Sequence, residues 1–167
     1  GIRAINIGPL LGLHDWRSEV FLSGVHAAYL QKRFPDIEIS VSLPRMRPQF
    51  GDYQPEFPVS DRDLVQSILA LRIFLPRAGI TISTRESSEL RDNLVRLGVT
   101  KMSAGSSTAI GGHTDAKEVA GQFEISDKRS VDETRKAISR LGYKPILKDW
   151  HDLSWGGNKK DAAVSIS

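Results

Sequence analysis

The sequence predicts an α/β fold with parallel strands. Strand-like and helix-like segments alternate along the 167 residues, and successive strand segments are roughly 25 to 35 residues apart, the length of a βαβ unit. Charged or hydroxyl residues follow several strand segments, which is how parallel sheets and barrels present their chemistry. About four such units make half of a TIM-type (β/α)8 barrel, which takes about 250 residues when complete. We expect such a half-barrel plus a C-terminal segment, and a complete flavodoxin-like open sheet remains the alternative.

The first half of the chain contains two strand–helix units. We expect a strand with its exit loop at residues 2–13, a helix at 16–33, a strand at 37–43, a long loop at 44–58 and a helix from 60 or 61 to 75. Gly8, Pro9 and Gly12 end the first strand. Asp15 is suited to cap the first helix. The loop at 44–58 is too long for a simple connection, which favours a functional role.

The second half continues the alternation. We expect strands at residues 80–84 and 99–104, helices at 86–97 and 130–141, and an extended segment at 144–148. Ser130 and Glu133 have the spacing of a capping box. Residues 1–152 are expected to form one domain and 153–167 a disordered tail. In a half-barrel, apolar interior residues would lack a partner, and the residues we expect there are Ile5, Ile7, Val41 and Ile82.

Composition excludes several classes of function. The net charge of +3 comes from basic residues interspersed with acidic ones, which argues against nucleic acid as a partner. No apolar run approaches the length of about 20 residues that spans a membrane, and no signal peptide opens the chain, so we expect a cytoplasmic protein. The chain has no cysteine, so it cannot itself ligate an iron–sulfur cluster or form a disulfide. It begins without Met inside a strand-like segment, and we expect it to be a fragment.

The sequence lacks several common catalytic and nucleotide-binding motifs. It contains neither a Gly-x-Ser-x-Gly elbow nor a nucleotide-binding glycine motif. Its four histidines share no spacing typical of metal ligands, and they are His14, His26, His113 and His151. We therefore expect no metal site made from these histidines.

Two neighbouring strand ends carry the strongest candidates for substrate binding. Arg85 ends the strand at 80–84, where its guanidinium could bind a carboxylate with two hydrogen bonds. A structural ion pair with Glu86 or another carboxylate is the alternative. Ser103, Ser106 and Ser107 follow the next strand and offer hydroxyls to an amine or a phosphate, unless this stretch is only a flexible turn.

Five segments in the same order and spacing resemble the C-terminal half of the 2-iminoacetate synthase family, the radical S-adenosylmethionine tyrosine lyases of thiamine thiazole biosynthesis. They are GPLLGLHDWRSE (8–19), SVSLPRMRP (40–48), ITISTRES (80–87), MSAGSSTAIGGH (102–113) and GYKPILKDW (142–150). The resemblance covers roughly residues 1–152. It implies a radical S-adenosylmethionine barrel whose N-terminal half, absent here, holds the cysteines for a 4Fe–4S cluster, followed by the segment shared with biotin and thiamin synthesis enzymes.

The resemblance also implies a reaction and site roles. A deoxyadenosyl radical takes hydrogen from the amino group of tyrosine, and cleavage of the Cα–Cβ bond gives 2-iminoacetate and p-cresol. Arg85 is then expected to bind the substrate carboxylate and Ser103 its amine, with Ser106 and Ser107 as neighbouring candidates. Arg45 and the turn from Gly8 to Gly12 are expected to contact S-adenosylmethionine, because glycine lets the backbone approach a flat adenine.

Other interpretations stay open at this point. The related lyases that mature iron-only hydrogenase bind a second cluster through C-terminal cysteines, so the lack of cysteine favours the thiamine branch. A related tryptophan lyase shares the barrel. The chain could instead be a module that docks thiazole synthase through residues 111–122, or a barrel enzyme that binds phosphate at 103–112. By resemblance, a flavodoxin or ferredoxin would donate the electron.

Overall fold

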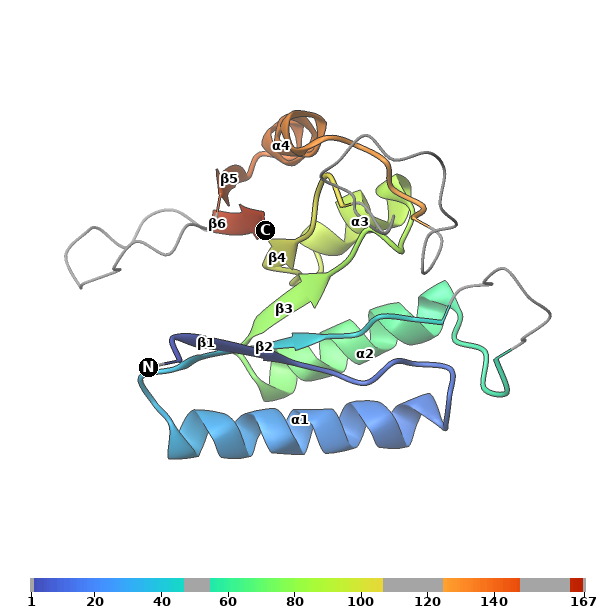
Figure 1. The fold of residues 1–167 in the computed structure, drawn as a ribbon, viewed down its shortest axis with the longest axis vertical. Coiled ribbons are helices and arrows are strands. Elements are labelled where there is room, and N and C mark those ends of the chain that lie inside the picture. Colours follow the sequence, from blue (N-terminus) through green and yellow to red (C-terminus); the bar gives the residue numbers. More distant parts are fainter. Residues whose placement is uncertain (1, 47–54, 107–124, 148–162, 167) are drawn as a thin grey trace, which may run out of the picture.

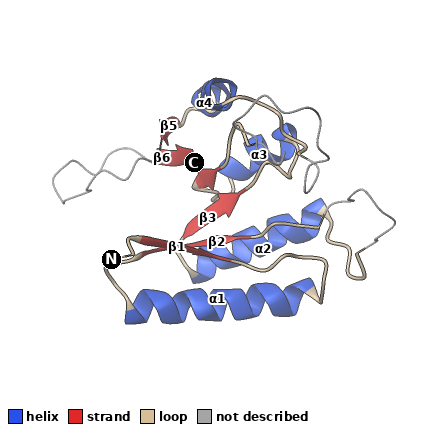
Figure 2. Cartoon of the chain, viewed as in Figure 1, coloured by secondary structure: helices blue, strands red, loops and turns tan. Residues whose placement is uncertain are grey.

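The computed structural model describes residues 2–46, 55–106, 125–147 and 163–166, which form a parallel α/β sheet with covering helices (Figure 1). The strands are all parallel, in the order β1 (Ala4–Ile7), β2 (Glu38–Ser42), β3 (Gly79–Ile82), β4 (Lys101–Met102), β6 (Ala163–Ile166) and β5 (Lys144–Leu147). The helices are α1 (Trp16–Arg33), α2 (Asp61–Phe74), α3 (Ser88–Val95) and α4 (Val131–Arg140) (Figure 2). The predicted α/β fold with a parallel sheet is confirmed.

Strands β1 to β4 lie side by side in chain order. A flavodoxin-like sheet would instead place its second strand outside the first. Right-handed crossovers between strands in chain order put every helix on the same face of the sheet. Figure 1 shows α1 and α2 lying together along one side of β1 and β2, as this rule requires.

Local sequence determines where the helices begin. The Asp15 carboxylate accepts a hydrogen bond from the backbone of Ser18 at 3.0 Å, which confirms the predicted cap of α1. The predicted capping box of Ser130 and Glu133 opens α4, and Ser60 with Asp63 forms another at α2. Helix α3 begins two residues later than expected, at Ser88, because Ser87 is its N-cap, with extended backbone and a side chain that accepts a hydrogen bond from the Leu90 amide.

The two faces of the sheet differ in polarity. Val41 and Ile82 are 0% and 2% exposed in the core under the helices, and Ile5 and Ile7 pack against that core. We expected these four residues to face a barrel interior with nothing packed against them, and that expectation was wrong. Alternation along a strand separates the residues of its two faces, but it does not tell which face the helices cover.

The opposite face carries polar groups. Asn6 donates a hydrogen bond to the Ser42 hydroxyl at 3.2 Å and accepts one from Thr81 at 3.4 Å. At the beginning of the strands, Lys101 of β4 forms an ion pair with Glu38 of β2. Its side chain crosses β3 at Gly79, where an added Cβ would lie 3.2 Å from Lys101 Cε. A larger residue at position 79 would first meet Ser40 of β2, whose Cβ would lie 2.9 Å from the added Cβ, and then the end of the Lys101 side chain.

The C-terminal part of the sheet differs from our expectation. Strand β5 does not pair with β4, because β6 lies between them and pairs with both. Residues 163–166 thus form a strand where we expected a disordered tail, and the alternating sequence Ala-Val-Ser-Ile suits a strand. The rest of the expected tail, residues 153–162, lies outside the described residues.

Past their strands, the segments after β1 and β2 continue to run together. The Leu11 amide donates to Pro44 O, and the Met46 amide donates to Leu11 O, each at 2.8 Å. Gly8 lies where a Cβ would overlap the carbonyl oxygen of Ser42. Among the described residues, no helix is long and apolar enough to cross a membrane.

We predict that Gly8→Ala destabilises the complete protein by about 3 kcal/mol, because a methyl group cannot share space with a backbone carbonyl. The measurement is the free energy of unfolding in denaturant. Gly24→Ala in α1 is the control, since the flexible side chain of Leu71 is its nearest neighbour and alanine favours a helix. Unchanged stability in Gly8→Ala, with weaker binding of S-adenosylmethionine, would instead support the expected cofactor contact.

Candidate functional site

The carboxyl ends of β2, β3 and β4 bring together most of the residues that we expected to form a site. Parallel strands end at one edge of the sheet, so Arg45, Arg85 and Ser103 follow three adjacent strands at the same edge. The three residues differ in burial and in partners. These differences decide which of them can face a ligand.

Arg45 is engaged within the fold. Its side chain is 4% exposed, and its Nε donates to Glu86 Oε1 at 3.0 Å. The guanidinium also donates to Val59 O at 2.9 Å and pairs with Asp61 at 2.7 Å. Burial acts to lower the pKa of Arg45, but the hydrogen bonds and charges of Glu86 and Asp61 outweigh it and raise the pKa. These contacts tie the end of β2 to β3 and α2, while the contact with S-adenosylmethionine stays a prediction.

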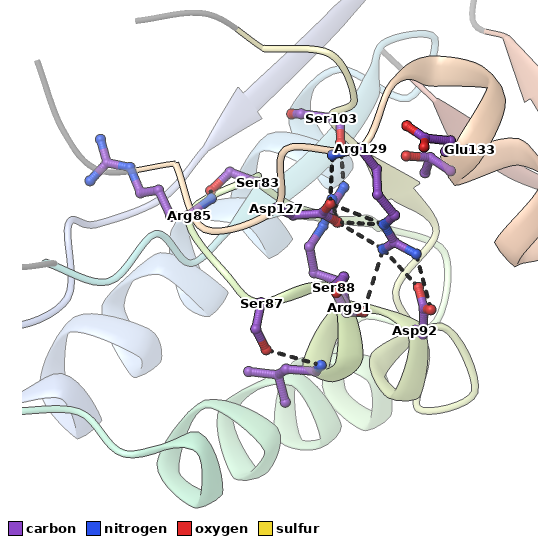
Figure 3. Close-up of polar contacts among 12 residues, drawn as sticks. Ser83, Arg85, Ser87, Ser88, Arg91, Asp92, Ser103, Asp127, Arg129 and Glu133 are labelled. Carbon is purple, nitrogen blue, oxygen red and sulfur yellow. Dashed lines mark hydrogen bonds and ion pairs between the residues drawn. The ribbon is translucent and has the colours of Figure 1, made fainter. Parts of the chain in front are cut away.

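Arg85 is half-buried and points away from the ionic groups around α3 (Figure 3). Loss of water around the guanidinium lowers the pKa of Arg85, and the charge of Glu86 opposes that shift. Glu86 itself is fully buried and accepts hydrogen bonds from Arg45. A carboxylate arriving at Arg85 would meet a partly desolvated cation, which strengthens a charge-assisted hydrogen bond.

The hydroxyl candidates lie after β4. Ser103 is half-buried, and its amide donates to Ile82 O at 3.1 Å, which continues the pairing of β3 with β4. Its carbonyl accepts a hydrogen bond from Arg91. Ser106 is exposed, and Ser107 lies outside the described residues. Of Ser103 and Ser106, Ser103 is the one whose backbone these two hydrogen bonds hold in place.

The backbone after β1 requires glycine at positions 8 and 12 for structural reasons. Gly8 allows the close approach to Ser42 described above. Gly12 has φ +118°, a conformation that L side chains rarely adopt, and its carbonyl accepts from the Phe57 amide at 3.3 Å. Their expected contact with S-adenosylmethionine stays a prediction.

Our sequence analysis missed a buried ionic cluster beside Ser103, which consists of Arg91, Asp92, Asp127 and Arg129 (Figure 3). Arg91 and Asp127 form an ion pair with both side chains 0% exposed. The sequence does carry a signal, since Arg91, Leu94 and Val95 share one helix face and are all buried. A charged residue within the apolar face of a short helix predicts a buried ion pair.

The cluster shifts the ionisation of its members. Burial lowers the pKa of Arg91, although the charge of Asp127 opposes the shift. Burial also acts to raise the pKa of Asp127, but hydrogen bonds from Arg129 and the nearby positive charges outweigh it and lower the pKa. The Asp127 carboxylate is therefore held in its charged form.

The chain does not supply ligands for an iron–sulfur cluster. It has no cysteine, and no group of three His, Asp or Glu side chains among the described residues could hold a metal ion. Arg85 and Ser103 are both half-buried at this edge, and their expected contacts with a substrate stay a prediction.

Two curated relatives are similar to nearly all of the chain. The 2-iminoacetate synthase of Salmonella typhimurium is 37% identical over 158 residues, and that of Escherichia coli is 36% identical over 151 residues. These matches cover 94% and 90% of this chain but 41% and 40% of the relatives. The chain thus spans about two fifths of their length.

Solved structures and a family model agree with this similarity. A crystal structure of HydG, a maturase of the FeFe-hydrogenase, matches 84% of this chain with a TM-score of 0.73 at 34% identity, and covers 31% of that chain. HydG from Carboxydothermus hydrogenoformans matches 89% with a TM-score of 0.74 at 36% identity, and covers 34% of that chain. The model of the Biotin and Thiamin Synthesis associated domain matches residues 42–144. With more than half of its residues matched by that model, the chain belongs to the family of Biotin and Thiamin Synthesis associated domains.

Proposed function

We propose that this chain is the C-terminal part of a radical S-adenosylmethionine lyase that cleaves the Cα–Cβ bond of tyrosine to give 2-iminoacetate and p-cresol for thiamine thiazole synthesis. The observation that carries the proposal is the identity of 37% to a 2-iminoacetate synthase over 94% of the chain. The location of Arg85 and Ser103 at one sheet edge supports it.

The proposal includes a half-barrel. The helices cover one face of the sheet, and Asn6, Ser42 and Thr81 hydrogen-bond on the other, as expected if that face lines a barrel interior. Strand β1 lies at the edge of the sheet. A preceding strand from the rest of the protein would pair there and continue the barrel.

The residues of this chain would hold the substrate. Adjacent parallel strands lie about 4.8 Å apart, and Ser103 continues the pairing of β4 with β3, the strand that leads to Arg85. From the ends of these adjacent strands, the guanidinium of Arg85 would bind the carboxylate of an amino acid and the hydroxyl of Ser103 its amine. S-adenosylmethionine and the 4Fe–4S cluster, whose cysteine ligands the rest of the protein would provide, would supply the hydrogen-abstracting radical. The contribution expected of this chain is to orient the amino acid substrate toward that radical.

A second candidate is a related aromatic amino acid lyase. The likeness to two HydG structures, with TM-scores of 0.73 and 0.74, favours it. The reaction products distinguish the two candidates, because lyases of this kind differ in the aromatic fragment that they release or in what becomes of the remaining carbon fragment. Docking of thiazole synthase and electron donation by a flavodoxin or ferredoxin belong to the first candidate.

The function is tested on the complete protein with a reconstituted cluster, S-adenosylmethionine, a reductant and tyrosine. Formation of p-cresol and 2-iminoacetate is the expected result. Cleavage of tryptophan, or none of either amino acid, would overturn the proposal.

We predict that the chain on its own is catalytically silent and marginally folded, because an open half-barrel leaves strand edges unpaired. The measurement is p-cresol formation by the purified chain after treatment with iron, sulfide and S-adenosylmethionine. Activity of this chain alone would contradict the prediction.

In the complete protein, we predict that Arg85→Lys is nearly as damaging as Arg85→Ala, since lysine keeps the charge but loses the two-pronged geometry. Turnover efficiency with tyrosine should fall by roughly 30- to 1000-fold, which corresponds to about 2–4 kcal/mol. Arg77→Lys is the control, because Arg77 is exposed just before β3. Normal turnover with a sharply lowered melting temperature would mean that Arg85 serves a structural ion pair.

For Ser103→Ala, we predict that tyrosine still binds but is poorly oriented, so that deoxyadenosine forms with less p-cresol per S-adenosylmethionine consumed. The measurement is the ratio of these two products in mutant and wild type. Ser106→Ala and Ser107→Ala are the matched controls. If one of these lowers the ratio and Ser103→Ala does not, the amine contact belongs to that neighbour.

A further inference from the structure

The ionic cluster of Arg91, Asp92, Asp127 and Arg129 reaches both strand ends of the proposed site. Arg91 of α3 donates to the carboxylate of Asp127 through one terminal nitrogen and to the carbonyl of Ser103 through the other. Its Nε is buried and has no hydrogen-bond partner among the residues that the structure describes. The two terminal nitrogens therefore carry the hydrogen bonds that orient this side chain.

The segment that contains Asp127 also bonds to the chain at the end of β3. The backbone amides of Ser126 and Asp127 both donate to the carbonyl of Thr84 at 3.0 Å. Thr84 is the residue directly before Arg85, and it is 2% exposed. Asp127 thus links the backbone beside Arg85, through Arg91, to the backbone of Ser103.

Arg129 completes the connection. Its Nη2 donates to Asp127 Oδ2 at 2.7 Å and to Asp92 Oδ1 at 2.9 Å, which joins the segment to α3. Its backbone carbonyl accepts from the amide of Gly105 at 3.3 Å. The residues directly after β4 are consequently held at two points, Ser103, which Figure 3 shows beside the cluster, and Gly105.

We propose that Arg91, Asp127 and Arg129 are positioning residues that fix the separation of Arg85 from Ser103 and so orient the amino acid substrate. The inference rests on the proposed function, because it takes Arg85 and Ser103 as the substrate contacts. Its structural basis is independent of the relatives. One buried network bonds to the backbone at both contacts, and a shift of either would misalign the reacting bond.

Another arginine, Arg72 of α2, joins the opposite ends of β3 and β4 and offers a control. Arg72 of α2 donates to Ala78 O at 2.9 Å, before β3, and to Gly98 O at 2.7 Å, before β4. Arg72 thus bonds directly to a carbonyl before each strand, whereas Arg91 bonds to the Ser103 carbonyl and to Asp127, whose amide donates to Thr84 O. Of the two arginines, Arg91 acts at the carboxyl ends, so Arg72→Lys separates a loss of stability from a loss of positioning.

The experiment compares Arg91→Lys with Arg72→Lys in the complete reconstituted protein. Lysine keeps the charge but carries its donors on a single nitrogen, so it lacks the planar fork with which the guanidinium reaches two acceptors that lie apart. We expect both variants to melt at a lower temperature. Arg91→Lys should lower the yield of p-cresol per deoxyadenosine by about tenfold, while Arg72→Lys leaves that ratio unchanged. Amide hydrogen exchange should quicken at Gly105 and Asp127 in the first variant, and at Thr100, beside Gly98, in the second.

The outcomes separate the two proposals. A folded Arg91→Lys protein with the wild-type ratio, or an equal fall in both variants, overturns the positioning role alone. A wild-type protein that forms no p-cresol from tyrosine overturns the proposed function and this inference with it. If Arg91→Lys does not fold, Asp92→Asn loosens only Arg129 at the partly exposed edge of the cluster. It should lower the ratio too, and an unchanged ratio overturns the inference.

Discussion

Burial of charge at the carboxyl ends of the strands is the constraint on which this structure depends. Arg45, Glu86, Arg91 and Asp127 are each at most 4% exposed. Removing one partner of such a pair typically costs about 3–5 kcal/mol, because the other charge is left buried without compensation. The residues that carry these buried charges must therefore keep the positions that their partners require.

Glu86 shows how this constraint acts on its neighbours. Because its carboxylate is fixed by Arg45 inside the protein, the chain before α3 has a set direction. Arg85, the residue before it, is directed away from the cluster around α3. Burial of the Glu86 anion thus helps to fix the direction of the half-buried cation that comes just before it. The Arg91–Asp127 pair has a comparable effect on Ser103.

Local signals in the sequence were sufficient for much of the fold and insufficient for the site. The caps at Asp15 and Ser130 depend on contacts three residues away, so they could be predicted. The Arg45–Glu86 pair joins residues 41 positions apart, and no local pattern specifies it. Alternation in β1 and β2 separated two faces correctly, but only the packing of helices decides which face is covered. The insertion of β6 between β4 and β5 is likewise a matter of long-range pairing.

The ion pair across β3 has a consequence for how this sequence can vary. Gly79 leaves the space through which Lys101 reaches Glu38, so the three positions form one packing unit drawn from three strands. A side chain at position 79 would press on Ser40 Cβ at 2.9 Å and on the end of the Lys101 side chain at 3.2 Å, so a change there requires its neighbours to adjust. Evolution can change these positions together far more readily than singly. Covariation among the three columns of a family alignment would record this coupling, although the residues lie far apart in the chain.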